Sequence, residues 1–381
     1  MADPGPLTAP VRTLAIVHNN IDQASSIGAI ARWQVQEALD RDWQVVAVCR
    51  DLDPEFVGHV QHVPLYVPPR LHLVQWSVAR ATVRAALRGV AYDVLMVHQP
   101  QLAGIADLWN VHYLSRAARD VRVPPGPGWR SRVQDVQAAG VAHLEDRYLS
   151  RVPRSTRVLF CSTTIRDDFI RLYGEHSNSS TIPHPALTAA ESPPIDGALP
   201  DHARRRQVTG GHPGPVVGFL GGGDPRKGGD LLVAAVAAEP ELFLVHAGSP
   251  GLDTSDPRVS GRHQDLGHLA DVSDLLDVID VLVVPSRFEP FGLVAVEAAA
   301  RGVPVLATPA VGALPLLVAA GAGDTWHPGS PLSPAVADMI ERRGDIGRAG
   351  RAVAATLASG RVADLLFAEI ETVWRTKERT V

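Results

Sequence analysis

The sequence predicts an α/β protein built from two doubly wound, Rossmann-like parallel-sheet domains that face each other across a cleft. Short apolar runs alternate with helical segments along the chain, and this rhythm is interrupted once, in a Pro- and Gly-rich stretch. The length agrees, because 381 residues exceed what one hydrophobic core usually holds. The predicted parts are an N-terminal domain over 1–190, a linker over 191–215, a C-terminal domain over 216–361 and a final helix over 362–381 that packs back on the first domain.

In the N-terminal domain, four apolar runs read as buried strands, at 13–17, 45–49, 93–97 and 158–161. A helix is expected to begin after Ser25 or Ser26, either of which suits an N-cap. A second, amphipathic helix is expected over 73–87, with an inward face of Val74, Val78, Ala81 and Ala85 and an outward stripe of Arg80, Arg84 and Arg88. The run V-P-P-G-P-G-W at 123–129 predicts a loop.

In the C-terminal domain the pattern restarts with strands at 216–220 and 242–245. It continues with a βαβ unit over 280–309: strand, turn at 285–292, helix at 293–300 and strand at 303–307. The turn lies where doubly wound sheets bind ligands, at the carboxyl end of a strand and before a helix N-terminus.

Composition excludes several classes of protein. The net charge of −5 provides no basic excess for nucleic acid. Cys49 and Cys161 each end an apolar run, which indicates reduced core thiols. Neither the Pro-rich start at 1–10 nor the interrupted apolar run at 231–245 suits a signal peptide or a membrane span, so we expect a cytoplasmic protein. The basic residues are almost all arginine, which favours a GC-rich bacterial source, and the only lysines are Lys227 and Lys377.

Two carboxylates mark the βαβ unit. Glu297 lies in an otherwise apolar helix, where it either pairs with Arg301 one turn later or binds a ligand. Glu289 lies in the turn, just before three backbone amides at the positive end of the helix dipole that suit a phosphate or sugar hydroxyls. These amides belong to Phe291, Gly292 and Leu293.

A Gly-rich loop over 219–229 follows the first strand of the C-terminal domain. Its glycines allow close backbone approach, and Arg226 and Lys227 supply two positive charges for a diphosphate. The loop has neither the Walker pattern nor a G-x-G-x-x-G, which argues against a nicotinamide dehydrogenase. On its own, the loop is better interpreted as a flexible surface turn with two solvated charges.

The N-terminal domain adds His98, at the end of a strand, which is a candidate for the cleft or a structural histidine. Gly28 is placed to admit a phosphate or simply to start a helix. No metal cluster is recognisable, and Asp51 and Asp53 read as a solvated loop although their spacing suits a divalent ion. The arginine stripe of the second helix leaves open a weak contact with acidic lipid headgroups, with a solvated face as the simpler reading.

Together these residues resemble the family-four glycosyltransferases, retaining enzymes of the GT-B fold. The run S-R-F-E-P-F-G at 286–292, with Glu297-Ala298 and G-V-P-V at 302–305, matches the family signature, whose two glutamates stand eight positions apart. The similarity is clearest over 216–320. It is weaker in the N-terminal domain, through Gly28, the strand ending at His98 and Ile182-Pro183.

The resemblance implies a role for each candidate. Glu297 would bind the ribose of a nucleoside-diphosphate sugar, and Glu289 with the amides of the helix start would face its sugar and phosphate. Lys227 would neutralise the leaving diphosphate, and His98 would lie by the transferred sugar. Other donor contacts are expected from the two glycine-containing loops and from residues that flank the base: Gly28, Gly222, Arg226, Gly248, Ser249, His268 and Leu269. The resemblance implies neither metal nor cofactor.

Two positions depart from the family. The arginine that usually precedes this lysine by five residues is replaced by Gly222, and Arg226 is the candidate substitute. The family's Pro-Asn-Gly near the end of the first domain reads Pro183-His184-Pro185.

The hypothesis is transfer of a hexosyl unit from a UDP- or GDP-linked sugar to a hydroxyl of a small molecule or glycolipid, with retention. The alternatives are a sugar-nucleotide hydrolase or epimerase of the same fold and a non-catalytic nucleotide-sugar binding protein. Acceptor contacts are expected from loops at 99–113 and 122–131, and the sequence does not identify the acceptor.

Overall fold

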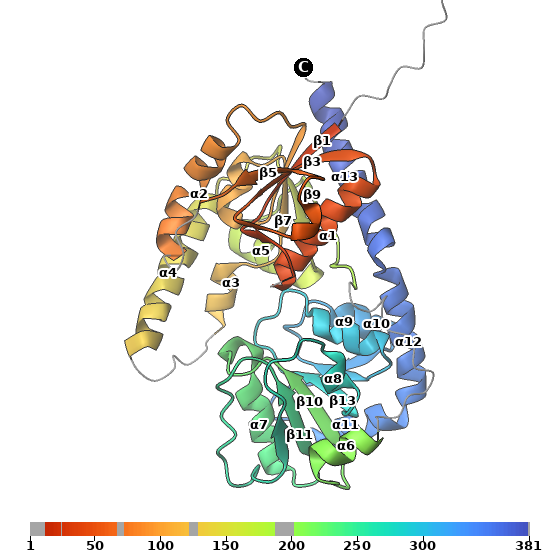
Figure 1. The fold of residues 1–381 in the computed structure, drawn as a ribbon. Coiled ribbons are helices and arrows are strands. Elements are labelled where there is room, and N and C mark those ends of the chain that lie inside the picture. The colour runs from red at the N-terminus through yellow and green to blue at the C-terminus, as the bar shows by residue number, and fades with distance from the viewer. Residues whose placement is uncertain (1–11, 24, 67–71, 122–128, 187–201, 380–381) are drawn as a thin grey trace, which may run out of the picture.

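The computed structural model describes residues 12–23, 25–66, 72–121, 129–186 and 202–379. It contains two α/β units, with the N-terminal one above the C-terminal one in Figure 1, and two successive helices near the end of the chain, Arg343–Thr356 beside the C-terminal unit and Ser359–Glu378 beside the N-terminal unit. Each unit is built around its own parallel sheet, as the alternating pattern predicts. The predicted fold class is therefore confirmed.

The N-terminal sheet has seven parallel strands in the order β5-β3-β1-β6-β7-β8-β9. The strand order reverses between β1 and β6, which pair in register. The strands are β1 (Arg12–Val17), β3 (Trp43–Cys49), β5 (Gln61–Pro64), β6 (Val94–Val97), β7 (Leu108–Val111), β8 (Arg157–Phe160) and β9 (Ser179–Thr181), and β2 (Asn20–Ile21) and β4 (Asp51–Leu52) form a small separate pair.

Helices cover both faces of this sheet (Figure 1). They are α1 (Ser26–Asp40), α2 (His72–Ala86), α3 (Ser115–Asp120), α4 (Trp129–Leu149) and α5 (Thr163–Tyr173), with the 3-10 turns η1 (Pro54–Phe56) and η2 (Pro100–Ile105). Ser25 is the N-cap of α1, because its Oγ accepts a hydrogen bond of 3.1 Å from the amide of Gly28.

The C-terminal sheet has six parallel strands in the order β12-β11-β10-β13-β14-β15, and its order reverses between β10 and β13. Its strands are β10 (Val216–Leu220), β11 (Phe243–Ala247), β12 (His263–Asp265), β13 (Val281–Val284), β14 (Val305–Ala307) and β15 (Gly323–Thr325). Its helices are η3 (Pro225–Lys227), α7 (Gly229–Ala238), α8 (Ser273–Leu276), α9 (Leu293–Ala300), α10 (Leu314–Ala320), α11 (Ser333–Glu341) and α12 (Arg343–Thr356).

The predicted linker is not all loop. Within 191–215 the structure has the helix α6 (His202–Thr209), while 187–201 lie outside the described residues. Arg204 and Arg205 hold α6 on the C-terminal domain, with ion pairs of 2.5 Å to Asp274 and Asp280. The proline and glycine content suggested a linker, but these arginine contacts stabilise a short helix that the pattern did not reveal.

The final helix α13 (Ser359–Glu378) packs on the N-terminal domain. Its apolar face enters the core between the first sheet and α1, through Val362, Ala363, Leu366, Phe367 and Ile370. Arg157 of β8 adds an ion pair of 2.7 Å to Glu369. The last described helix thus packs on the same domain as the first described strand (Figure 1).

The predicted inward face of α2 is wrong. Val74, Val78, Ala81 and Ala85 are exposed, and the helix buries Ala79 and Val83 instead, together with Leu87 directly after it. Arg80 lies on the buried side, where its Nε donates to the carbonyl of Gln101 at 2.7 Å and its guanidinium covers the ring of Tyr148. The aliphatic stem of an arginine packs well on an apolar surface, so the charge of Arg80 does not by itself show that this side of the helix faces solvent.

The predicted loop at 99–113 is also wrong, because it contains η2 and the buried strand β7. The predicted loop at 123–129 lies outside the described residues except for Trp129, where α4 begins.

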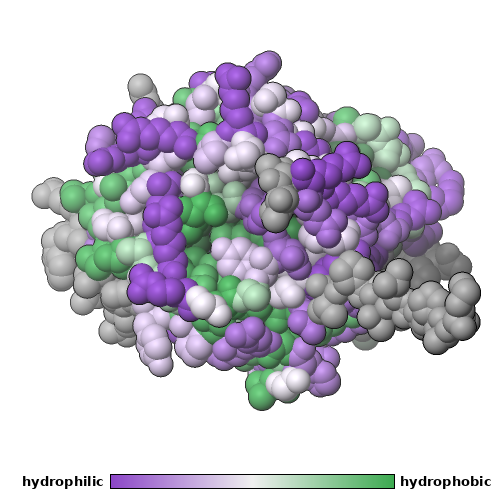
Figure 2. Space-filling model, turned by 90° about the horizontal axis from the view of Figure 1, so that it is seen from above, coloured by the Kyte–Doolittle hydropathy of each residue, from purple (hydrophilic) through white to green (hydrophobic). Residues whose placement is uncertain are grey.

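Among the described residues, none of the helices combines the length and the apolar character that a membrane span requires. Figure 2 looks onto the molecule from above and shows hydrophilic side chains spread over this face, with hydrophobic residues visible between them.

Candidate active site

The candidate site is built on the point where the C-terminal sheet reverses its strand order. The Gly-rich loop 221–228 follows β10, and the turn 285–292 follows its neighbour β13. Parallel strands end at the same edge of their sheet, so the two loops meet there. In doubly wound sheets this crevice is the usual place for a ligand.

An ion pair joins the two loops. Nζ of Lys227 contacts Oε2 of Glu289, and both side chains are mostly buried, with 29% and 15% exposed. Lys227 closes the 3-10 turn η3, which Asp224 caps by accepting from the amide of Arg226 at 2.9 Å. The backbone of Glu289 is fixed as well, since its amide donates to the carbonyl of Ala310 at 3.2 Å. The two residues that the sequence assigned to catalysis in this domain are therefore in direct contact.

Arg226 reaches towards the N-terminal domain. Its guanidinium forms a 2.5 Å ion pair with Asp224 and lies 5.6 Å from the ring centre of Tyr113, which follows β7. The ring of Tyr113 also meets Phe288 edge-on at 5.3 Å. Burial raises the pKa of the Tyr113 hydroxyl although Arg226 opposes this effect. The Gly-rich loop thus contacts both domains.

The helix α9 begins at the same turn. Gly292 is its N-cap with a φ of 91°, and a Cβ there would lie 2.8 Å from Cγ1 of Val311, so both the backbone angle and the space favour glycine. Phe291 is buried and Leu293 opens the helix. Glu297 lies one turn further on and is partly buried. Arg301, its suggested ion-pair partner, donates to Asp277 at 2.6 Å.

The glycines of the Gly-rich loop pack against the residues that follow β11, the strand that pairs with β10. Gly222 has a φ of 56°, and a Cβ there would lie 1.8 Å from the carbonyl oxygen of Ser249. A side chain at position 222 is therefore excluded in this conformation, which gives a structural reason for the missing family arginine. The amide of Gly248 donates to the carbonyl of Gly267 at 2.8 Å, which brings 248–249 beside His268 and Leu269, the exposed and partly buried residues expected near the base.

In the N-terminal domain, His98 follows β6 at the strand-order reversal of its own sheet, next to β1 and the loop leading to Gly28. Its side chain is buried, with 5% exposed, and its Nδ1 lies 2.8 Å from Nε2 of His112. Nδ1 of His112 lies 2.7 Å from Nε2 of His184. The ring of His184 packs against Phe291 of the other domain at 5.0 Å.

Burial keeps these three imidazoles neutral. It lowers the pKa of His98 and of His112 well below 6.5, with smaller contributions from the neighbouring histidines, and it lowers the pKa of His184 to about 4.

Sequence reasoning missed His112 and Tyr113 because it took their strand, β7, for a loop. The rule that selected His98, a polar residue directly after a buried strand, also selects His112 once β7 is recognised. His184 had been noted only as a departure from the family. Among the described residues, no group of three or more His, Cys, Asp or Glu side chains is arranged so that it could hold a metal ion.

Two doubly wound domains with their strand ends turned towards each other define the GT-B fold of glycosyltransferases. Residues 214–342, which contain both site loops, match the family described as "Glycosyl transferases group 1". The C-terminal domain of this chain is thus similar to that family.

Curated relatives extend the match. The D-inositol 3-phosphate glycosyltransferase of Mycobacterium bovis (strain BCG / Pasteur 1173P2) is 32% identical over 256 residues, which cover 60% of this chain and 49% of the relative. That of Segniliparus rotundus is 33% identical over 199 residues, or 46% of this chain and 44% of the relative. The matched regions thus span about half the length of these relatives.

Solved structures share the fold over nearly the whole chain. Sucrose-phosphate synthase of Thermosynechococcus elongatus has a TM-score of 0.72 at 20% identity and covers 96% of this chain and 100% of its own. HepE of Anabaena, in complex with UDP-glucose, has a TM-score of 0.62 at 16% identity and covers 95% and 99%.

Proposed function

We propose that this protein is a retaining glycosyltransferase that moves a hexosyl unit from a nucleoside-diphosphate sugar to a hydroxyl group of a small-molecule or glycolipid acceptor. The observation that carries the proposal is the ion pair of Lys227 and Glu289 at the strand-order reversal of the sheet. It lies inside the region that matches the glycosyl transferase family.

The chemistry follows from charge. When the bond between sugar and diphosphate breaks, negative charge grows on the leaving phosphate, and fixed positive groups lower that barrier most when they are shielded from water. Lys227 is the first candidate for the positive group that binds this phosphate. Once Lys227 binds the phosphate, its ion-pair partner Glu289 is free to contact the sugar. Arg226 is a second cation, and the first amides of α9 add donors at the positive end of the helix dipole. We therefore expect turnover to persist in the presence of a chelator.

Glu297 is the candidate ligand for the ribose, because a partly buried carboxylate accepts two hydroxyl hydrogen bonds in a fixed geometry. No side chain among the described residues is an evident covalent nucleophile, so retention would follow from attack on the same face from which the diphosphate departs. The other donor contacts that the resemblance implies are also predictions.

A UDP-linked sugar is the first donor to test, since UDP-glucose was bound by the structurally similar HepE. The cytoplasm is the expected compartment, because Cys49 and Cys161 are buried and unpaired, as in proteins of reducing compartments.

The test begins with thermal stabilisation by UDP, GDP and dTDP sugars, each measured against NAD. A donor that binds at a hundred times its Kd stabilises the native state by about 2.7 kcal/mol. Mass-spectrometric screening of acceptors with that donor follows, and NMR of the product gives its anomeric configuration. Inversion would contradict the mechanism. Stabilisation by NAD alone would contradict the function.

The hydrolase or epimerase alternative is separated by the same donor without acceptor. Release of free sugar, or of an epimerised donor, at the rate seen with acceptor would favour it over transfer. Binding without any turnover would favour a non-catalytic sugar-nucleotide binding protein.

A further inference from the structure

Three buried histidines form a row at the carboxyl edge of the N-terminal sheet. His98 follows β6, His112 follows the adjacent β7, and His184 lies just beyond β9. Two contacts join them in series, at 2.8 Å from Nδ1 of His98 to Nε2 of His112 and at 2.7 Å from Nδ1 of His112 to Nε2 of His184. Their side chains are 5%, 7% and 9% exposed.

The number of protons in this row is fixed by its burial. Each imidazole is neutral near pH 7 because burial lowers all three pKa values, and a neutral imidazole carries one N–H. Each of the two ring-to-ring hydrogen bonds holds one proton. The third proton therefore lies on one of the two outer nitrogens, either Nε2 of His98 or Nδ1 of His184. Only these two arrangements keep both hydrogen bonds.

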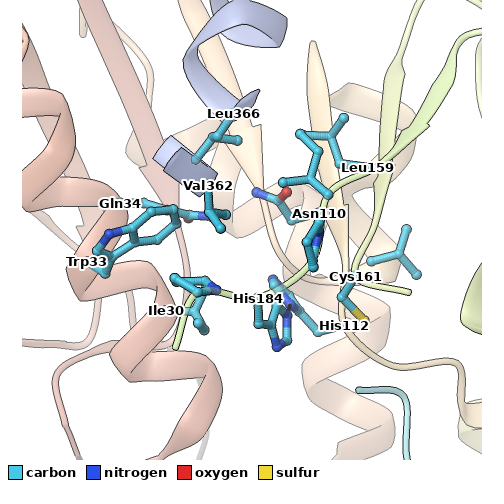
Figure 3. Close-up of a pocket in the computed structure, with 14 residues that line it drawn as sticks. Ile30, Trp33, Gln34, Asn110, His112, Leu159, Cys161, His184, Val362 and Leu366 are labelled. Carbon is cyan, nitrogen blue, oxygen red and sulfur yellow. Dashed lines mark hydrogen bonds between the residues drawn. The ribbon is translucent and has the colours of Figure 1, made fainter. Parts of the chain in front are cut away.

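Both outer nitrogens are buried without a hydrogen-bond partner among the described residues. His184 lines a small cavity of about 20 Å³, roughly the space of one water molecule. Gln34 from α1 and Asn110 from β7 line the same cavity, as Figure 3 shows. Oε1 of Gln34, an acceptor, and Nδ2 of Asn110, a donor, are also buried without a partner in the described part of the chain.

The cavity therefore offers His184 a partner in either arrangement. When Nδ1 of His184 carries the proton, a water in the cavity accepts from it and donates to Oε1 of Gln34. When it does not, the water donates to it and accepts from Nδ2 of Asn110. Because an unsatisfied buried polar atom is costly, such a matched pair makes both arrangements of the row accessible.

We propose that His98, His112 and His184 act as one tautomeric unit, in which His184 sets, through His112, whether Nε2 of His98 donates or accepts a hydrogen bond at the candidate active site. Conversion moves one proton within each hydrogen bond, while one outer nitrogen takes up a proton and the other releases one to water, so no ring becomes charged. His184 is a positioning residue. The proposal rests on the proposed function only in placing His98 beside the transferred sugar.

The contact between His184 and Phe291 extends this unit to the other domain. Phe291 lies immediately before the cap of α9, and its ring lies 5.0 Å from that of His184 at an angle of 52°. Pro183 and Pro185 restrict the backbone on both sides of the histidine. The ring of His184 is thus held in position by residues of both domains.

The experiment uses the full chain labelled with ¹⁵N at histidine. In the wild type at pH 7 we expect ¹⁵N–¹⁵N couplings across both ring-to-ring hydrogen bonds and matching tautomers in His98 and His112. The variant His184→Phe keeps a ring against Phe291 but removes both nitrogens. It should abolish the second coupling and leave His98 and His112 as tautomer mixtures, while His246, a buried histidine outside the row, keeps its signals.

Activity gives a second readout. In His184→Phe, kcat should fall at least about tenfold, because His98 no longer keeps one tautomer beside the transferred sugar, while KM for the donor changes less than about twofold. The variant His184→Gln retains a group that can donate or accept towards His112, so it should recover most of kcat.

Several results would overturn the proposal. They are the absence of either coupling in the wild type, unchanged tautomers in His184→Phe, and a glutamine variant as slow as the phenylalanine variant. If the wild type transfers sugar from no donor, the proposed function fails, yet the couplings still decide whether the row is one unit. If His184→Phe does not fold, the wild type and His184→Gln decide it.

Discussion

Ser162 of the N-terminal domain donates a hydrogen bond of 2.5 Å from its Oγ to the carbonyl oxygen of Pro290 in the C-terminal domain. The same Oγ accepts from the amide of Ile165 at 3.1 Å and so caps α5. Pro290 directly follows Glu289, so this contact ties the candidate donor loop to the end of β8. One hydroxyl thus caps a helix and links the two domains.

Replacing Ser162 by alanine should therefore have two effects. Loss of the cap costs about 0.5–2 kcal/mol, and a buried carbonyl left with the weaker donor Cys161 adds about 1 kcal/mol or more. Because the loop carrying Glu289 becomes less restrained, KM for the donor should rise several-fold. Urea unfolding and steady-state kinetics measure the two effects.

Ser25→Ala is the matched control for stability, since Ser25 caps α1 and makes no hydrogen bond to the other domain among the described residues. It should lose only the cap. If the two variants lose the same stability and Ser162→Ala keeps the donor KM of the wild type, the contact to Pro290 has no role in stability or in donor binding.

The two lysines of the chain allow a paired test of the leaving-group charge. Lys227→Ala removes the cation that contacts Glu289, and kcat should fall about 10²–10³-fold, as for other groups that stabilise transition-state charge. Lys377→Ala is the control. Its Nζ donates to Asp107 at 2.8 Å, just before β7, at the opposite edge of the sheet from His112. Steady-state kinetics should show wild-type turnover in the control, and the same turnover in Lys227→Ala would remove this lysine from the site.

Gly222 tests whether the family arginine can be restored. In Gly222→Arg the new Cβ would meet the carbonyl of Ser249 at 1.8 Å, so the loop must move, and both stability and affinity for UDP should fall. Gly58→Arg provides the control, because Gly58 has a φ of 87° and no atom within 4 Å of a Cβ. It should lose only the backbone cost of about 1–2 kcal/mol. Urea unfolding and UDP titration compare them, and tighter UDP binding by Gly222→Arg would contradict the steric argument.

The sequence predicted most of the sheet because the central strands are continuous apolar runs. The runs at 216–220 and 281–284 coincide with β10 and β13, and the helix at 293–300 coincides with α9. The strand β7 was missed because its four residues, Leu108–Val111, include an asparagine and give no apolar run. Its burial comes from its place between β6 and β8, which only the tertiary structure reveals.

The candidate site also has one part that the sequence predicts and another that only the tertiary structure reveals. Lys227 and Glu289 were predictable from the family resemblance, although the Gly-rich loop alone indicated a solvated turn, and their contact follows from the pairing of β10 with β13. The histidine row was not, because His112 and His184 are 72 residues apart in the chain and meet only through the strand order. The prediction of the exposed face of α2 was wrong for a related reason, because Arg80 packs inward against Tyr148, which is distant in the chain.

The pH dependence of folding provides a last test of the buried histidines. His184 has an ordinary pKa of 6.5 when unfolded and a pKa of about 4 in the native protein, because burial disfavours its charged form. Between these values the unfolded chain binds more protons than the native one, so stability must fall as the pH is lowered. His98 and His112 shift in the same direction.

For His184 alone, lowering the pH from 7 to 5 should cost about 2 kcal/mol of unfolding free energy. Urea unfolding at pH 7, 6 and 5 measures this loss in the wild type. In His184→Phe the curve should be flatter by about the same amount, because one group that gains a proton on unfolding is gone. The difference between the two proteins removes the contribution of carboxylates, which both share. Parallel curves would mean that His184 is not held neutral in the native state.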